Sequence, residues 1–192
     1  YYTVREGDTL SSIASKSNTN LKMLLAANDL AEPDNLFVGQ KILIPFSEFV
    51  VPTTLRFSSD VMNILLGSLA ARYPFLSFSS IGKSVLGKDL VSLRLGRGKK
   101  IVSYNASHHA NEWITSLLLV KFVEMFCHAL VTERRLGVYD PREVFDSASI
   151  YIVPMVDPDG VNLVTGQIPA GSTLYENAEK LNTFGLPFPE GW

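Results

Sequence analysis

Residues 100–113 read KIVSYNASHHANEW, and this stretch decides how the rest of the chain is interpreted. Lys100 to Tyr104 predicts a strand, and the apolar run that follows predicts a long helix. Between them, His109-Ala110-Asn111-Glu112 sets an imidazole and a carboxylate apart by two residues. Both groups are ligands that zinc accepts, and they can meet on one ion where the backbone turns. The sequence therefore predicts half of a zinc site at the end of a strand.

The histidine count limits this site. The chain has three histidines, His108, His109 and His128, and the last falls inside the predicted helix. Zinc in hydrolases usually takes three protein ligands and leaves the fourth position for water. No histidine or arginine follows Val161, so we expect two metal ligands, no general base and no activity of the chain alone. A His-x-x-Glu pair is weak by itself, and a chance pair in an unrelated α/β domain is an alternative.

The composition is that of a globular chain and argues against two classes of partner. Of the 192 residues, 46% are hydrophobic, which is enough for the core of one or two domains. The formal net charge is -2 and the basic residues are scattered, so we expect no nucleic-acid partner. The apolar run from Ile114 to Leu130 contains Lys121 and Glu124 and falls short of the ~20 residues that cross a bilayer. We therefore expect a buried helix and no membrane span, with Cys127 as an inert buried thiol.

The first 45 residues form a unit with its own pattern. Tyr2 to Val4 and Lys41 to Ile44 predict two short strands, and two helical patterns lie between them. Asp8 or Thr9 can cap the first helix, because an oxygen at that place accepts from the free amides of the first turn. The apolar positions of this helix are Leu10, Ile13 and Ala14, and those of the second helix are Leu21, Leu24 and Leu25.

This unit resembles a LysM domain. The matching residues are Tyr2-Thr3-Val4, Gly7-Asp8-Thr9-Leu10, Ile13-Ala14, Leu24-Leu25, Ala27-Asn28 and Val38 to Pro45. The resemblance implies a βααβ module that binds N-acetylglucosamine polymers, peptidoglycan or chitin, in a shallow groove between two loops. Carried over, the groove residues are Gly7, Asp8, Thr9, Leu10, Asn28, Asp29 and Leu30. A small module that only contacts other proteins is the alternative.

The rest of the chain predicts a second domain of the α/β class. We place the module at residues 1–46, a linker at 47–54 and the second domain at 55–192. A helix is expected from Ser59 or Asp60 to Arg72, and one long helix after the His-x-x-Glu motif. The strands expected beside Lys100 to Tyr104 are Leu76 to Ser84, Leu90 to Leu95 and Ser149 to Met155. Strands and helices in this order predict a mixed sheet with helices packed on it, and we interpret Asp157-Pro158-Asp159-Gly160 as a structural turn.

The second domain resembles the amino-terminal part of the M14 family of zinc carboxypeptidases. The matching residues are Ile81-Gly82-Lys83-Ser84, Gly87-Lys88, Ile101-Val102-Ser103-Tyr104, His109 to Trp113, and Val153 to Val161. The resemblance implies Zn²⁺ as cofactor, with His109 and Glu112 as its first two ligands. It leaves His108 as a neighbour that supports a ligand or does nothing. The family's third ligand and its general-base glutamate lie in later segments than any matched here.

The two resemblances together point to the bacterial γ-D-glutamyl-diaminopimelate peptidases, which cut the stem peptides of peptidoglycan. They imply two partners, the glycan strands and the stem peptides, and an extracytoplasmic location that is cell-wall or spore-associated. A module that holds glycan beside a peptidase raises the local concentration of stem peptides. The alternative is a non-catalytic protein that binds peptidoglycan or chitin and carries an incomplete or inactive peptidase-like domain.

Overall fold

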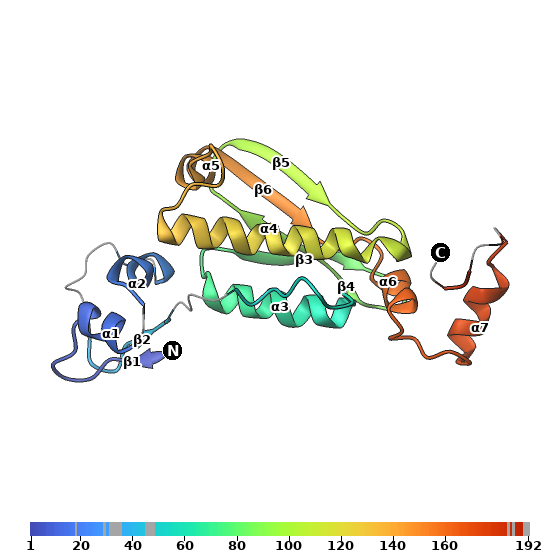
Figure 1. Cartoon of the computed structure of the whole chain (residues 1–192), viewed down its shortest axis with the longest axis horizontal. Helices are drawn as coiled ribbons and strands as arrows, with labels where there is room; N and C mark the ends of the chain where they lie inside the picture. Colours follow the sequence, from blue (N-terminus) through green and yellow to red (C-terminus); the bar gives the residue numbers. More distant parts are fainter. Residues whose placement is uncertain are drawn as a thin grey trace.

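The computed structural model describes residues 1–17, 19–28, 30, 36–44, 49–183, 185 and 187–189. It is elongated, with a small unit at the amino-terminal end, a sheet with helices in the middle and a short helix at the far end (Figure 1). The predicted limit between residues 46 and 47 falls outside the described residues, so the domain limits stay a prediction.

The small unit has the βααβ order that its sequence predicts. Strand β1 (Tyr2–Thr3) pairs antiparallel with β2 (Lys41–Ile42), and helices α1 (Leu10–Lys16) and α2 (Leu21–Ala27) lie between them in the chain. Both strands are two residues long, so the longer strands expected from the sequence were wrong. The apolar face of α1 was predicted correctly, whereas on α2 only Leu24 of the three predicted positions is buried and Leu21 and Leu25 are partly buried. The core of this unit contains Val4, Leu10, Ile13, Ala14, Leu24 and Ile42.

Thr9 caps α1, and its neighbour Asp8 does not. The Thr9 hydroxyl accepts from the Ser12 amide at 3.1 Å, while the Thr9 amide donates to the Ser12 hydroxyl at 3.0 Å. These two bonds satisfy donors that the first turn of a helix leaves free. In the same way the Asn20 side chain accepts from the Met23 amide at the start of α2.

The larger unit is built on a four-stranded sheet in the order β3-β4-β6-β5. The strands are β3 (Ser77–Lys83), β4 (Asp89–Leu95), β5 (Lys100–Asn105) and β6 (Ala148–Val153). β3 and β4 form the expected antiparallel hairpin, β4 pairs antiparallel with β6, and β5 runs parallel to β6. The sheet is therefore mixed, and the α/β class is confirmed.

Two long helices cover one face of this sheet. Helices α3 (Ser59–Arg72) and α4 (Trp113–Thr132) contact each other and lie along the sheet (Figure 1). Leu93 and Leu95 of β4 and Ile150 and Ile152 of β6 alternate along their strands and belong to the same buried cluster as the apolar residues of both helices. Burial of this face is the main stabilising contribution to the unit.

Three short helices were not expected. They are α5 (Pro141–Ser147), α6 (Pro158–Val164) and α7 (Thr173–Lys180). The segment interpreted as a structural turn is in fact the start of α6, because the Asp157 carboxylate accepts from the Gly160 amide at 2.9 Å and Pro158 occupies the first helical position. Proline is well suited to that position, since its missing N–H has no partner there anyway.

The central helix is longer than the apolar run from Ile114 to Leu130 from which it was predicted. With the 3-10 turn Ala110–Glu112 before it, the helical stretch covers 23 residues, Ala110–Thr132, and it alone among the described residues is long and apolar enough to cross a membrane. Its most apolar window is 56% buried, and Val120, Val123 and Cys127 are fully buried against the sheet and α3. These contacts are those of a core helix. The expectation that Cys127 is buried is confirmed.

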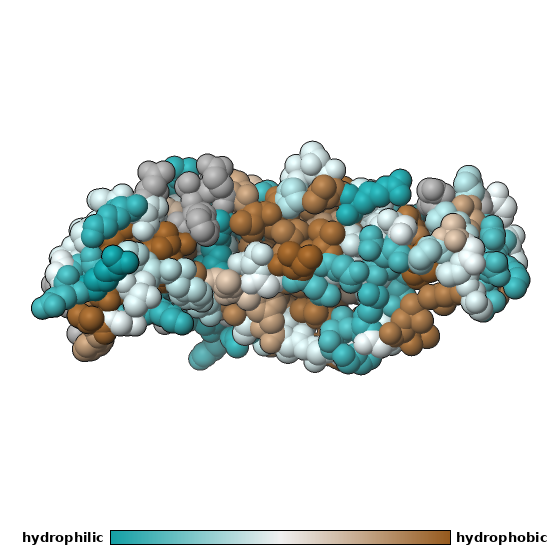
Figure 2. Space-filling view, turned by 90° about the horizontal axis from the view of Figure 1, so that it is seen from below, coloured by the Kyte–Doolittle hydropathy of each residue, from teal (hydrophilic) through white to brown (hydrophobic). Residues whose placement is uncertain are grey.

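The face of the molecule seen from below carries both hydrophilic and apolar residues. Figure 2 shows hydrophilic residues over most of it and its largest apolar area over the middle of the molecule. Strand β5 forms one edge of the sheet, and all six of its residues are exposed.

Residues 49–51, which follow the small unit in the chain, are bound to α4. The amides of Val50 and Val51 donate to the carboxylate of Glu124, which is completely buried, and the Val51 bond to Oε2 is 3.1 Å long. Lys121 donates both to the Glu124 Oε2 at 2.9 Å and to the Val51 carbonyl at 3.0 Å. Arg72 lies 3.7 Å from the same carboxylate. The segment between the two units is thus held by a buried ionic group.

Candidate metal centre and glycan-binding loops

The His-x-x-Glu loop follows the carboxyl end of β5 and is attached to the chain beyond β6. The Val156 amide donates to Ala106 O at 2.9 Å, and the Asp157 amide donates to Ser107 O at 2.9 Å. Ser107 has a φ of 50°, which turns the chain away from the strand direction. The Ser107 hydroxyl donates to Glu112 O at 2.9 Å, so the residues before and after His109 are joined by a hydrogen bond. Ligands of open α/β sheets gather at this end of the strands.

His109 and Glu112 are brought together. The His109 Nδ1 lies 2.8 Å from the Glu112 Oε1, and the His109 amide donates to Oε2 at 3.2 Å. The side chain of His109 is 76% exposed and that of Glu112 is 40% exposed. The hydrogen bond to the carboxylate raises the pKa of His109, and the bond to the imidazole lowers the pKa of Glu112. The two groups therefore stabilise each other in their charged forms.

The rings of the other two histidines do not bond to the pair, although His108 lines the same cavity as His109. The His108 Nε2 lies 2.8 Å from the Asn105 Oδ1, so this ring is turned toward the end of β5. His128 lies near the far end of α4, where its ring centroid is 5.0 Å from that of Phe49 and burial lowers its pKa. Neither ring joins the His109–Glu112 pair.

Helix α6 packs closely on the turn that carries the pair. A Cβ added to Gly160 would lie 2.9 Å from the Ala110 Cβ and 2.1 Å from the Asp157 Oδ2, so only glycine fits this approach. A cavity of about 360 Å³ opens beside the motif, and its wall includes His109, Asp157 and Leu163. Leu174 and Ala178 of α7 line the same cavity.

Asp159 is a residue that the sequence interpretation did not assign to this region. Its Oδ1 accepts from the Ser84 hydroxyl at 3.0 Å and its Oδ2 from the Leu86 amide at 3.0 Å. These bonds bring the β3–β4 loop, with Leu86, to the wall of the cavity. The Asp-Pro-Asp-Gly sequence signalled a helix start, but nothing local signalled a contact 75 residues away.

The pair supplies two of the four ligands that a zinc ion usually takes. An imidazole nitrogen and a carboxylate oxygen within 2.8 Å of each other, both partly exposed, can share one ion when the proton between them is lost. Across the described residues, no group of three or more His, Cys, Asp or Glu side chains gathers in a way that could hold a metal. The two donors fit zinc, and their role as its ligands stays a prediction.

The predicted glycan-binding residues have different local roles. Gly7 has a φ of 82°, which the first loop needs, and Leu10 is 2% exposed and belongs to the core of the unit. The Asp8 Oδ2 accepts from the Tyr2 hydroxyl at 2.7 Å, and Oδ1 pairs with Lys16 at 3.0 Å. Thr9 is the helix cap described above.

On the second loop, Asn28 joins α2 to the end of the unit. Its Nδ2 donates to Leu24 O at 2.8 Å and Leu43 O at 2.9 Å, and its Oδ1 accepts from the Leu43 amide at 2.7 Å. Both of its amide hydrogens are therefore engaged within the unit. Leu30 lines a cavity between the two units, and Asp29 lies outside the described residues. The structure leaves the glycan-binding roles of all seven residues as predictions.

Two family profiles match this chain. The profile described as "LysM domain" matches residues 2–45, and that described as "Zinc carboxypeptidase" matches residues 62–183, more than half of the chain. The chain belongs to the zinc carboxypeptidase family. It also carries a LysM domain, and the two resemblances read from the sequence are confirmed.

Curated relatives align with this chain over only part of their own length. A γ-D-glutamyl-L-diamino acid endopeptidase 1 from Lysinibacillus sphaericus is 38% identical over 106 residues, which cover 55% of this chain and 27% of the relative. An uncharacterized protein of Bacillus subtilis, YqgT, is 38% identical over 120 residues, covering 62% of this chain and 32% of the relative. The chain therefore spans about a third or less of these relatives.

Solved structures are also similar to part of the chain. Bovine thrombin-activatable fibrinolysis inhibitor, in complex with a tick carboxypeptidase inhibitor, aligns with 56% of this chain and 33% of its own, at 21% identity and a TM-score of 0.47.

Proposed function

We propose that this chain serves a cell-wall zinc peptidase that hydrolyses γ-D-glutamyl-diaminopimelate bonds in peptidoglycan stem peptides, with the LysM unit holding the glycan. The observation that carries the proposal is the 2.8 Å contact between His109 and Glu112 at the carboxyl end of β5, in a member of a zinc family. The relative named as a γ-D-glutamyl-L-diamino acid endopeptidase supports the choice of bond.

In this proposal His109 and Glu112 are two of the zinc ligands. A bound zinc would polarise the scissile carbonyl and lower the pKa of a coordinated water. This chain's own residues position the ligands: Ser107 closes the turn, and Gly160 allows α6 to approach it. Leu163 and Leu174 supply an apolar wall beside the motif, which helps to exclude water from the bound peptide.

The ligand assignment can be tested by zinc content and turnover. In a form of the protein that supplies the remaining donors, His109→Ala and Glu112→Ala should each lose stoichiometric zinc and the hydrolysis of a γ-D-glutamyl-diaminopimelate peptide. His108→Ala is the matched control, because its ring is turned toward Asn105, and it should keep the metal. Zinc retained in both ligand variants would remove the pair from the metal site.

The second candidate is a glycan-binding protein whose peptidase-like domain is inactive. It is favoured by the finding that no three-donor metal group forms within the described ranges. Zinc titration of the 192-residue chain separates the two candidates. Weak binding is expected from two ligands alone, whereas a tight ion in one-to-one ratio would reveal a third donor and contradict an inactive site.

Glycan binding and location belong to the same proposal. LysM domains bind peptidoglycan or chitin, so we expect the chain to co-sediment with insoluble peptidoglycan and to be released by soluble chitotetraose. Sedimentation that chitotetraose does not reduce would contradict a glycan groove. The proposed location is extracytoplasmic, at the cell wall or spore, because that is where the substrate is.

A further inference from the structure

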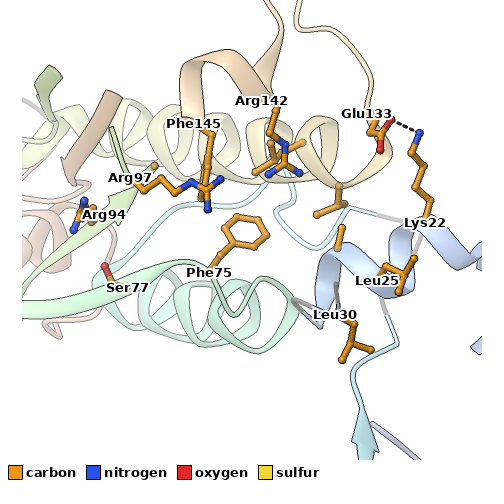
Figure 3. Close-up of a pocket in the computed structure, with 14 residues that line it drawn as sticks. Lys22, Leu25, Leu30, Phe75, Ser77, Arg94, Arg97, Glu133, Arg142 and Phe145 are labelled. Carbon is orange, nitrogen blue, oxygen red and sulfur yellow. Dashed lines mark ion pairs between the residues drawn. The ribbon is translucent and has the colours of Figure 1, made fainter. Parts of the chain in front are cut away.

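A second cavity lies at the junction of the two units. It measures about 590 Å³, and Leu25 and Leu30 of the LysM unit form one wall. Phe75 and Phe145 of the larger unit form the opposite wall, where their ring centroids are 5.5 Å apart (Figure 3). The cavity also contacts Leu130 near the carboxyl end of α4, whereas the His-x-x-Glu motif precedes the amino end of that helix. A helix of 20 residues is about 30 Å long, so the two sites are well separated.

The described residues that line this cavity include more basic than acidic side chains. Among the described residues that line it, Lys22, Arg94, Arg97 and Arg142 are basic and Glu133 is acidic. Lys22 forms an ion pair with Glu133 across the junction, and the Arg97 Nε donates to Asp146 at 2.8 Å. In the described part of the chain, neither Arg94 nor Arg142 has a carboxylate partner, and the buried Arg94 Nε has no hydrogen-bond partner there. The guanidinium of Arg97 lies 5.8 Å from the centroid of the Phe145 ring, and Figure 3 shows Arg142 and Phe75 among the residues around the cavity.

This lining matches an acidic peptide. Guanidinium groups bind carboxylates through two parallel hydrogen bonds, and aromatic rings pack against the apolar parts of such a ligand. In a γ-glutamyl linkage the α-carboxylate of glutamate stays free, so a stem peptide of the kind cut by the endopeptidase relative carries negative charge along its length. Leu30 places the cavity beside the second predicted glycan loop.

We propose that the junction cavity is an exosite that binds a carboxylate-bearing stem peptide of a glycan strand held by the LysM unit. The proposal rests on the glycan binding proposed above. Because the cavity lies about 30 Å from the His-x-x-Glu motif, the peptide bound there is not the one that is cleaved. Glycan and peptide would be held at neighbouring points of one polymer. Once the glycan is bound, the peptide therefore meets the exosite at a high effective concentration. This second contact lengthens the time that the protein stays on peptidoglycan, without any new contact at the metal.

Arg142 is the position at which to test the exosite, because it is exposed and its substitution should leave the fold intact. Calorimetric titration of the whole chain with a free stem tripeptide, L-alanyl-γ-D-glutamyl-diaminopimelate, should show binding that weakens about tenfold in Arg142→Ala. Arg142→Lys should restore part of it, since the charge is kept but the planar fork is lost. Arg56→Ala, an exposed arginine outside the cavity, is the matched control and should bind as the parent does.

Two further titrations separate this proposal from the proposed function. Chitotetraose reports the LysM groove, so it should bind equally to the parent and to Arg142→Ala. Tripeptide binding that is absent, or unchanged in Arg142→Ala, overturns the exosite whatever chitotetraose does. If the parent binds the tripeptide but not chitotetraose, the glycan groove is contradicted and the exosite remains only as a site for stem peptides, without a glycan held beside it. Inorganic phosphate that competes as well as the tripeptide would show a general anion site and overturn the peptide assignment.

Discussion

At the scale of single residues, the LysM unit depends on two polar side chains that were predicted for the glycan groove. Asn28 uses its whole amide to join α2 to Leu43, and Asp8 joins the first strand to the first helix. These hydrogen bonds and the ion pair show that each of the two side chains stabilises the conformation of its own loop. Whether either also contacts glycan stays a prediction, but a substitution at these positions will change stability as well as binding.

Asp8 gives a test in which stability depends on pH. The Tyr2 hydroxyl, the Arg5 amide and Lys16 lower the pKa of its carboxyl to about 2 from 3.8. Because the folded pKa is the lower one, the stabilisation is fully present above about pH 4 and is lost as the pH falls through about 2. Asp8→Asn should therefore lower the melting temperature of the LysM unit at pH 7, and the difference from the parent should shrink toward pH 2.

Calorimetric or circular-dichroism melts across this range provide the measurement. Glu6→Gln, at an exposed neighbouring position, is the control and should show no such pH-dependent difference. A constant difference between Asp8→Asn and the parent from pH 7 to pH 2 would mean that the charge of Asp8 is not what stabilises the unit.

At the scale of elements, the helices and strands that could be predicted from the sequence are those whose signal lies within their own residues. The helical spacing of apolar residues predicted α3, an apolar run predicted α4, and short segments between turns predicted the strands, because burial imposes such patterns. Helices α5 and α6 were missed although both begin with Asp-Pro, at Asp140 and Asp157. Seven residues are too few to show a clear apolar period, so only the cap signalled them.

Contacts that join distant segments could not be predicted. The motif located His109 and Glu112 from four consecutive residues, but the Asp159–Ser84 bond depends on how β3 and α6 meet in space. The same holds for Glu124, which reads as a charge that interrupts an apolar helix and is in fact bonded to backbone amides 73 residues or more away.

The cap of α5 can be measured directly. The Asp140 Oδ1 accepts from the Arg142 amide at 2.8 Å, so Asp140→Ala should lower the free energy of unfolding by about 1 kcal/mol. Asp140→Asn keeps an accepting oxygen and should lose only a fraction of that. Urea denaturation of the three proteins provides the comparison, and equal losses in the alanine and asparagine variants would show that charge rather than capping stabilises the helix start.

At the scale of the whole molecule, we expect the position of the LysM unit to depend on Glu124, because this carboxylate binds the segment that follows the unit. A carboxylate that is fully buried is costly unless it is paired, and here two backbone amides, Lys121 and Arg72 surround it. Since Val50 and Val51 belong to the connecting segment, the same bonds that stabilise the carboxylate also fix that segment on α4. The Lys22–Glu133 pair is exposed on both sides and should contribute little by comparison.

Glu124→Gln should therefore release the LysM unit as well as destabilise the fold. The glutamine keeps the shape but loses the charge that compensates Lys121, and loss of one partner of a buried pair costs about 3 kcal/mol. We expect faster proteolysis near Val50 and Val51 and a larger radius of gyration by small-angle scattering, at a temperature where far-ultraviolet circular dichroism still shows a folded chain. Glu133→Gln, which removes only the exposed pair, should change the free energy of unfolding by less than about 1 kcal/mol. If Glu124→Gln kept the parent's radius of gyration and cleavage rate, contacts between α2 and α4 alone would be holding the two units together, and the buried carboxylate would serve only the core of the larger one.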